Sequence, residues 1–376
     1  MSTSENDPAG FVPPVYPYDQ LDAAQARAAA LEGGLVDLSI GTPCDPPPPA
    51  VVAALAGSDA ERGYPASIGS ATYREAAVAW IARRFGVELD RTAVAACVGT
   101  KEFVATLPHL LKLRTPHRDT VLYPAVAYPT YEMGAILAGC RAVAVPVDDG
   151  WRLDLDAIDE ADAARALCLW ANTPGNPAGG LDDLGAVASW GRDHGVAVFS
   201  DECYAEFTWD GPPRSILEHG TDGLVAVHSL SKRSNMAGVR AGFYAGDGDL
   251  VHYLSEVRKH MGMMVPGPVQ AAAAVALDDD AHVKVQRDVY LERLQYFAGV
   301  LGRWSGADVP MPGGGFYLWM PAPGGAWAFT DRLATEGGAL VSPGEFYGQA
   351  GATHVRVAMV QPQERLELVA RRLGAT

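Results

Sequence analysis

The chain has 376 residues, of which 48% are hydrophobic and 20% charged, and its formal net charge is −16 at pH 7. This length exceeds one ordinary hydrophobic core and predicts two domains, while the acidic balance argues against nucleic acid or an anionic membrane as a partner. Residues 1–10 lack the basic start and apolar centre of a signal peptide, and no apolar run approaches the ~20 residues of a membrane helix, so we expect a cytoplasmic protein. The five cysteines lack metal-ligand spacing, so we expect reduced thiols and no metal.

Apolar runs alternate with helical patterns through the first two thirds of the chain. An extended arm and an alanine-rich helix at 21–31 precede a short strand at 36–40. The following strands are expected at 93–98, 120–123, 142–147, 166–171, 196–199, 224–227 and 241–245. Helical stretches separate most of them, which predicts an α/β fold with a mainly parallel, doubly wound sheet. Ligands of such sheets bind beyond the carboxyl ends of the strands.

The pattern changes after residue 245. Long helices are expected at 250–260, 269–277 and 281–303, and shorter elements follow to the end of the chain. We therefore expect a large domain at 46–279 and a smaller α+β domain formed by 1–45, with its N-terminal arm, and 280–376.

The most informative stretch follows the apolar run at 224–227. It contains Ser229, Lys232 and Arg240 around a glycine-containing turn. A desolvated lysine amine is a nucleophile, and hydroxyls with a guanidinium suit a phosphate, so the stretch points to pyridoxal 5′-phosphate. The alternative is a basic surface turn.

Other strand ends carry matching chemistry. Asp201 could hold the proton on a pyridine nitrogen, although a helix N-cap is the alternative. Tyr204 and Asn176 could bond the phenolic oxygen of the ring, and Tyr128 could stack on its face or simply pack in the core.

Two further sites complete the candidates. Thr100 and Lys101 follow a strand and begin a helix, where backbone amides favour a phosphate; the side chain of Lys101 could simply be solvated. Arg356, in an alternating strand, has the fork geometry for a substrate α-carboxylate, but a lone strand arginine is usually a surface residue.

With these residues placed, the chain resembles the class I/II aminotransferases of the aspartate aminotransferase superfamily, which have the pyridoxal-phosphate-dependent transferase fold type I. The resemblance runs from about residue 37 to the C-terminus. It rests on an ordered set: Gly41, Tyr64, Gly-Thr-Lys-Glu at 99–102, Tyr128, Asn-Pro-Ala-Gly at 176–179, Asp-Glu-Cys-Tyr at 201–204, Ser-Leu-Ser-Lys at 229–232, Arg240 and Arg356.

The resemblance implies a role for each of these residues. Lys232 forms the imine with the cofactor and moves the proton, with Asp201 and Tyr204 as the other catalytic residues. The remaining cofactor contacts are Thr100, Lys101, Tyr128, Asn176, Ser229 and Arg240, with Tyr64 reaching a phosphate across a homodimer interface. Gly41, Asn176 and Arg356 bind the substrate, an amino acid or a 2-oxo acid.

The stretches Val-Tyr-Pro-Tyr-Asp at 15–19, His-Ser-Leu-Ser-Lys-Arg-Ser-Asn-Met-Ala-Gly at 228–238 and Met-Met-Val-Pro-Gly-Pro-Val-Gln at 263–270 carry a closer resemblance, to actinobacterial succinyldiaminopimelate aminotransferases. It implies ping-pong aldimine chemistry between N-succinyl-LL-2,6-diaminopimelate and 2-oxoglutarate in lysine and diaminopimelate biosynthesis. Alternatives are an aspartate, aromatic or alanine aminotransferase, a carbon–sulfur β-lyase, or a cofactor-binding regulatory module. Candidates for the distal substrate pocket are Arg74, Arg233, Phe11, Tyr16 and Phe316.

Overall fold

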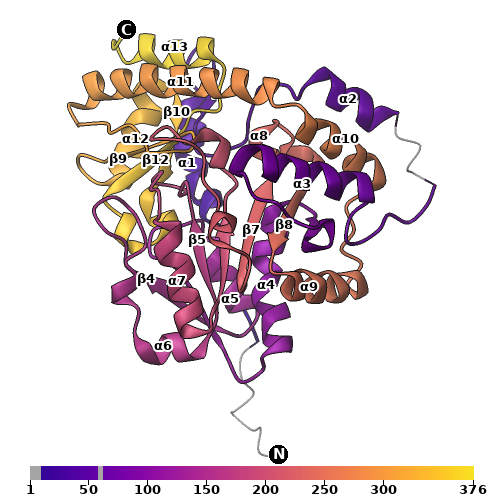
Figure 1. The fold of residues 1–376 in the computed structure, drawn as a ribbon. Helices are drawn as coiled ribbons and strands as arrows, with labels where there is room; N and C mark the ends of the chain where they lie inside the picture. Colours follow the sequence, from indigo (N-terminus) through magenta and orange to yellow (C-terminus); the bar gives the residue numbers. More distant parts are fainter. Residues whose placement is uncertain (1–9, 58–61) are drawn as a thin grey trace, which may run out of the picture.

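The computed structural model describes residues 10–57 and 62–376 (Figure 1). Its centre is a seven-stranded sheet with the order β2-β8-β7-β6-β5-β3-β4. The strands are β2 (Val94–Cys97), β3 (Thr120–Pro124), β4 (Arg141–Val145), β5 (Ala166–Asn172), β6 (Ala197–Asp201), β7 (Leu224–Ser229) and β8 (Gly242–Gly246). The mostly parallel α/β sheet predicted from the sequence is confirmed.

Only β8 runs against the other strands of this sheet, pairing antiparallel with both β2 and β7. The connection from β7 to β8 holds a one-turn helix, α8 (Leu230–Arg233), and no crossover helix, so the chain returns antiparallel. Lys232 lies in this connection, just beyond the carboxyl end of β7.

Side chains alternate between the two faces of the sheet, as the period of a strand requires. Val94 and Ala96 of β2 pack in one core, and Ala95 and Cys97 pack in the opposite one. The helices of the first core are α2 (Pro49–Ala56), α3 (Ala71–Phe85), α7 (Leu184–His194) and α10 (Gly267–Asp278). Those of the second are α4 (Thr100–Arg114), α5 (Thr130–Leu137) and α9 (Gly248–His260), while the short α6 (Glu160–Arg165) precedes β5.

A second group of elements packs around the long helix α11 (Ala281–Ser305), which runs along the upper edge of the view in Figure 1. Strands β11 (Ser342–Pro343), β12 (His354–Ala358) and β9 (Tyr317–Pro321) form an antiparallel sheet in that order, and β1 (Val36–Asp37) pairs parallel with β10 (Ala339–Leu340). The helices of this group are α1 (Asp22–Ala29), α12 (Ala326–Gly337) and α13 (Gln363–Arg372). Arg356 stands opposite Trp319 in the β12–β9 pair.

The group has its own apolar core, built from residues before 39 and after 293. The division into a large domain at 46–279 and a smaller one from 1–45 and 280–376 stays a prediction. The strand expected at 36–40 is only two residues long, and α6, β10 and β11 were not predicted.

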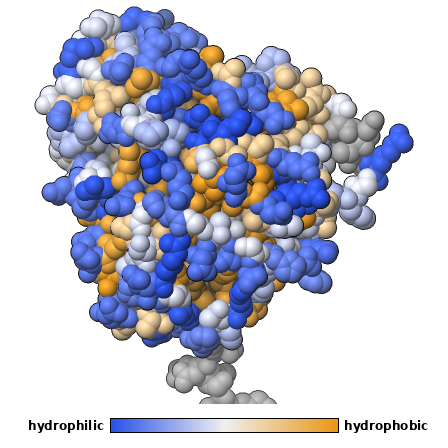
Figure 2. Space-filling view, viewed as in Figure 1, coloured by the Kyte–Doolittle hydropathy of each residue, from blue (hydrophilic) through white to orange (hydrophobic). Residues whose placement is uncertain are grey.

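The surface facing the viewer in Figure 2 mixes hydrophilic and hydrophobic residues. Within residues 10–57 and 62–376, no helix has the length and hydropathy needed to cross a membrane. The expectation about a signal peptide concerns residues that lie mostly outside the described ranges.

Candidate active site

A cavity of about 580 Å³ opens beyond the carboxyl ends of the central strands. All but one of the candidate site residues line it: Gly41, Thr100, Lys101, Tyr128, Asn176, Asp201, Tyr204, Ser229, Lys232, Arg240 and Arg356. Tyr64 is the exception, because its side chain is 98% exposed and stands outside the wall of this chain's cavity. The candidates that follow strands of the central sheet therefore gather at one edge of it, as the rule for such sheets predicts, and Gly41 and Arg356 join them from the rest of the chain.

Lys232 presents its amine to the cavity from the turn after β7. Its Nζ donates a hydrogen bond to the carbonyl oxygen of Gly41 and lies 5.8 Å from the ring centre of Phe316. Burial, followed by the positive charge of Arg356, lowers the pKa of the Lys232 amine to about 8. The neutral, nucleophilic form is therefore much more populated near neutral pH than it is for an ordinary lysine.

Asp201 ends β6 with its carboxylate buried at the cavity wall. Its Oδ2 accepts a hydrogen bond from the hydroxyl of Tyr131 at 2.8 Å, and its Oδ1 accepts one from the backbone N–H of Cys203 at 3.2 Å. Burial raises the pKa of this carboxyl, while both hydrogen bonds oppose the rise. A cationic partner in the cavity would hold Asp201 ionised. Tyr131 was given no role from the sequence.

The start of α4 offers the groups that an anion site needs. The backbone at Gly99 has a φ of 73°, and the first amides of the helix have no partner within it. A Cβ on Gly99 would lie 2.1 Å from Nη2 of Arg240, so glycine is needed for the guanidinium to approach. The hydroxyl of Ser229 accepts from the backbone N–H of Ser231 at 3.1 Å and also faces the cavity.

Arg356 reaches the cavity from β12, with only 2% of its surface exposed. Its guanidinium donates to Oδ1 of Asn176 at 2.8 Å, to the hydroxyl of Tyr18 at 3.2 Å and to the carbonyl oxygen of Ser39. The bond to Asn176 occupies the amide oxygen, so its Nδ2 group is the donor left for the cavity. A buried, fixed guanidinium is suited to bind a carboxylate.

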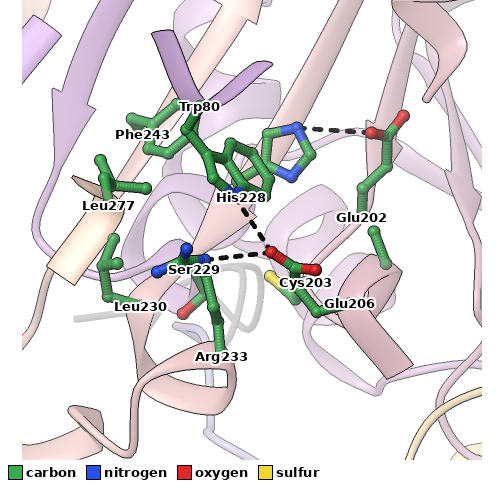
Figure 3. Close-up of a pocket in the computed structure, with 11 residues that line it drawn as sticks. Trp80, Glu202, Cys203, Glu206, His228, Ser229, Leu230, Arg233, Phe243 and Leu277 are labelled. Atoms are coloured by element: carbon green, nitrogen blue, oxygen red, sulfur yellow. Dashed lines mark hydrogen bonds and ion pairs between the residues drawn. The ribbon is translucent and has the colours of Figure 1, made fainter. Parts of the chain in front are cut away.

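A buried polar cluster stands behind the lysine turn (Figure 3). The carboxylate of Glu206 accepts from Arg233 at 3.2 Å, from the indole of Trp80 at 3.0 Å and from Arg84 at 2.7 Å. Arg233 is therefore held away from the substrate cavity, and its candidacy for the distal pocket is wrong. The cluster instead anchors the residue that follows Lys232.

Glu202 and His228 form a second buried pair near the Glu206 cluster (Figure 3). Oε2 of Glu202 lies 3.4 Å from Nε2 of His228. Burial lowers the pKa of His228 to about 3 and raises that of Glu202 to about 8. At neutral pH both groups are therefore mostly uncharged. Because neighbouring strand residues point to opposite faces, Glu202 lies behind Asp201.

Of the remaining candidates for the distal substrate pocket, some lie at the cavity and others do not. Tyr16 lines the cavity, and its hydroxyl lies 3.3 Å from Nζ of Lys101. Phe316 is buried beneath Lys232. Phe11 is 58% exposed and Arg74 bonds the carbonyl oxygens of its own surroundings, so neither lines the cavity in this chain.

The residues present fit pyridoxal 5′-phosphate. A buried amine, a buried carboxylate and an anion cradle face one cavity, which matches the aldehyde, ring nitrogen and phosphate of that molecule. The fold and this donor set define an enzyme that uses the cofactor.

Comparison with known proteins gives the family. Residues 34–373 match the family described as aminotransferase class I and II. A probable aminotransferase of Mycobacterium tuberculosis is 45% identical over 96% of this chain and 85% of its own length. The 4-dedimethylamino-4-oxo-anhydrotetracycline transaminase of Streptomyces rimosus is 43% identical over 96% of this chain and 99% of its own length. The LL-diaminopimelate aminotransferase of Aquifex aeolicus is 34% identical over 96% of each chain.

The solved structures agree. A probable N-succinyldiaminopimelate aminotransferase of Thermus thermophilus superimposes with a TM-score of 0.84 at 31% identity, over 96% of this chain and all of that one. The chain therefore belongs to the class I and II aminotransferases, and it is a pyridoxal-phosphate-dependent aminotransferase that acts on small amino and 2-oxo acids.

When bound, the cofactor supplies the electron sink for the reaction. The amine of Lys232 would take a proton from the substrate Cα and return it, since it is buried and its pKa is lowered. Arg356 would orient the substrate carboxylate, and Asp201 would keep the ring nitrogen protonated. Tyr204 and Asn176 would hold the ring, while Thr100, Ser229 and Arg240 would hold the phosphate.

Proposed function

We propose that the protein transfers the amino group between N-succinyl-LL-2,6-diaminopimelate and glutamate/2-oxoglutarate, as a step of lysine and diaminopimelate biosynthesis. Both substrates carry a carboxylate remote from the reacting carbon. The enzyme therefore needs a second cation in the cavity besides the one that binds the α-carboxylate.

The observation that carries the proposal is the side chain of Lys101. It lines the same cavity as Arg356, and its Nζ lies 3.3 Å from the hydroxyl of Tyr16 and 5.1 Å from the centre of that ring. Tyr16 is half exposed and belongs to the N-terminal arm, so Lys101 stands at the mouth of the cavity. A cation there suits a carboxylate at the far end of an elongated substrate.

The lining of the cavity also favours a long substrate. The rings of Tyr16 and Tyr18 are 5.6 Å apart and form one wall with Ile40. This wall offers apolar surface to a methylene chain and hydroxyls to an amide. The names of the Thermus thermophilus and Aquifex aeolicus proteins point to the same class of substrate.

The active unit proposed here is a homodimer. Tyr64 is almost fully exposed, and it would reach the phosphate in the partner's cavity. A cytoplasmic location stays a prediction.

The relative from Streptomyces rimosus favours a second candidate. That protein is named as a transaminase of an anhydrotetracycline, and its identity of 43% exceeds that of the LL-diaminopimelate aminotransferase. A polycyclic ketone would use the aromatic wall and would have no need of Lys101.

The test is a half-reaction screen with purified, cofactor-loaded protein. Glutamate, aspartate, alanine, a cysteine conjugate, LL-diaminopimelate and N-succinyl-LL-diaminopimelate are mixed with it separately, and conversion of the cofactor absorbance is followed by stopped flow. We expect fast conversion with glutamate and the succinylated compound, and slow conversion with aspartate. Failure of the succinylated compound would overturn the proposed substrate, and pyruvate with ammonia from the cysteine conjugate would instead indicate a β-lyase.

Lys101→Met provides the matched variant. Its backbone amide is retained, so the phosphate cradle stays intact. We expect a loss of roughly 10- to 100-fold in kcat/KM for glutamate and the succinylated donor, and less than about threefold for alanine, which has no second carboxylate. An equal loss for all three donors would remove Lys101 from the distal site.

A further inference from the structure

Tyr317, the first residue of β9, touches three parts of the active site. It is 2% exposed, and its hydroxyl lies 2.7 Å from the hydroxyl of Tyr204. The guanidinium carbon of Arg356 lies 4.2 Å from the centre of its ring. A Cβ on Gly41 would lie 2.0 Å from the Tyr317 hydroxyl, so this oxygen sits directly against the backbone that also accepts the bond from Lys232.

The surroundings of Tyr204 and Tyr317 indicate which of the two hydroxyls donates the hydrogen bond between them. Tyr204 has a single proton and lines the cavity, where an acceptor oxygen of the cofactor ring would need it. If Tyr204 donates into the cavity, its oxygen must be the acceptor in the bond to Tyr317. Tyr317 is then the donor, and two hydrogen bonds in series polarise each other.

We propose that Tyr317 is a positioning residue for this aminotransferase: its hydroxyl donates to Tyr204 and so directs the Tyr204 proton at the cofactor ring, while its ring supports Arg356. The hydroxyls of Tyr317 and Tyr204 are both buried, and their oxygen atoms lie 2.7 Å apart. One side chain thereby connects the group that binds the substrate carboxylate with a group that adjusts the charge of the cofactor.

The consequence is a coupling that neither contact provides alone. The ring of Tyr317 lies against Arg356 and its hydroxyl bonds Tyr204, so Tyr317 contacts both residues at once. Tyr317 also lies in the C-terminal part of the chain, whereas Tyr204 follows β6 of the central sheet. The bond therefore joins β9 to the segment that follows the carboxyl end of β6.

The test uses the cofactor-loaded enzyme and the variant Tyr317→Phe, which removes only the hydroxyl. The first readout is the pH midpoint of the visible absorbance band of the bound cofactor, measured without substrate. A weaker hydrogen bond from Tyr204 stabilises the deprotonated cofactor less, so the midpoint should rise by about 0.5 to 1 unit. Tyr204→Phe should raise it further.

Double substitution separates this role from a general structural effect. Tyr317→Phe should add nothing to Tyr204→Phe, because the path from Tyr317 to the cofactor has already been removed. Tyr244→Phe is the control, since it removes a buried hydroxyl that has no hydrogen-bond partner among residues 10–57 and 62–376 and does not line the cavity. Its midpoint should equal that of the parent.

Steady-state kinetics then separate the effect of the Tyr317 hydroxyl on Tyr204 from the effect of its ring on Arg356. Tyr317→Phe keeps the ring under Arg356, so KM should change less than about twofold while kcat falls roughly 3- to 10-fold. Tyr317→Leu removes the ring as well and should also raise KM. An unchanged midpoint in Tyr317→Phe, or a shift fully additive with that of Tyr204→Phe, would overturn the proposal. Neither result depends on which amino donor the enzyme prefers.

Discussion

The pKa of Lys232 gives a quantitative prediction for how the protein captures its cofactor. With a pKa of about 8, roughly a tenth of the amine is neutral at pH 7, against about 0.03% at the ordinary value of 10.5. The neutral amine attacks the cofactor aldehyde, so the buried lysine should react about 300-fold faster at pH 7 than an exposed lysine of equal intrinsic reactivity.

The sign of the pH dependence follows directly. Deprotonation is favoured in the folded protein, so the association rate of cofactor with cofactor-free protein should rise with pH up to about 8 and then level off. The assay is stopped-flow absorbance between pH 6 and 10. The small molecule Nα-acetyl-lysine serves as the reference, because its amine titrates near 10.4 and it reports the titration of the cofactor itself.

The variant Arg356→Met tests the cause of the shift. Arg356 supplies the second largest contribution after burial, and its removal should move the midpoint upward. A midpoint near 10 for the parent protein would refute the reasoning, as would a midpoint in Arg356→Met at or below that of the parent.

Four further substitutions test individual contacts. Asp201→Asn should retain the cofactor but lower kcat roughly 100-fold or more, because an amide cannot hold the ring nitrogen protonated; steady-state kinetics with near-normal turnover would contradict this. Arg356→Lys keeps the charge but loses the fork, so KM for the amino donor should rise roughly 10- to 100-fold, and an unchanged KM would contradict the carboxylate role. Gly41→Ala forces its Cβ against Tyr317 and should cost about 1–3 kcal/mol in the free energy of unfolding, measured by urea titration; wild-type stability would show that the hydroxyl moves freely. Arg233→Met removes one of the two arginines that bond the buried carboxylate of Glu206, while Arg84 remains, and should cost about 1.5–3 kcal/mol, which a thermal melt within a degree of the parent would refute.

The main features of the site could be predicted because they follow from local rules. Buried strands show as apolar runs, and their carboxyl ends must meet at one edge of a parallel sheet. Lys232 and Asp201 each follow such a run, so their convergence could be expected without coordinates. The alternation of a strand also separated Asp201 from Glu202 correctly.

The errors have equally local causes. Arg233 was a candidate for the substrate pocket because it follows Lys232, but α8 turns successive side chains by about 100°, and Glu206 captures the guanidinium on the far side. The strands β10 and β11 are two residues long and exist only through their pairing, so no periodicity marks them.

The aromatic residues of the site carry no sequence signal of their own. Tyr131 and Tyr317 lie in apolar surroundings where core packing is the ordinary interpretation, and only the fold shows that their hydroxyls meet Asp201 and Tyr204. Long-range pairs of this kind depend on tertiary placement rather than on spacing within one element. They are also the contacts that adjust the chemistry once the charged residues are in place.

The central claim is that Lys232 is the residue that holds the cofactor, within a cavity built by both parts of the chain. The most direct measurement is borohydride reduction of the cofactor-loaded protein, followed by proteolysis and mass spectrometry of the peptides. We predict a single stable pyridoxyl adduct on Lys232, absent from Lys232→Ala. An adduct confined to Lys101 or another lysine, with Lys232 unmodified and full transamination activity, would contradict the account.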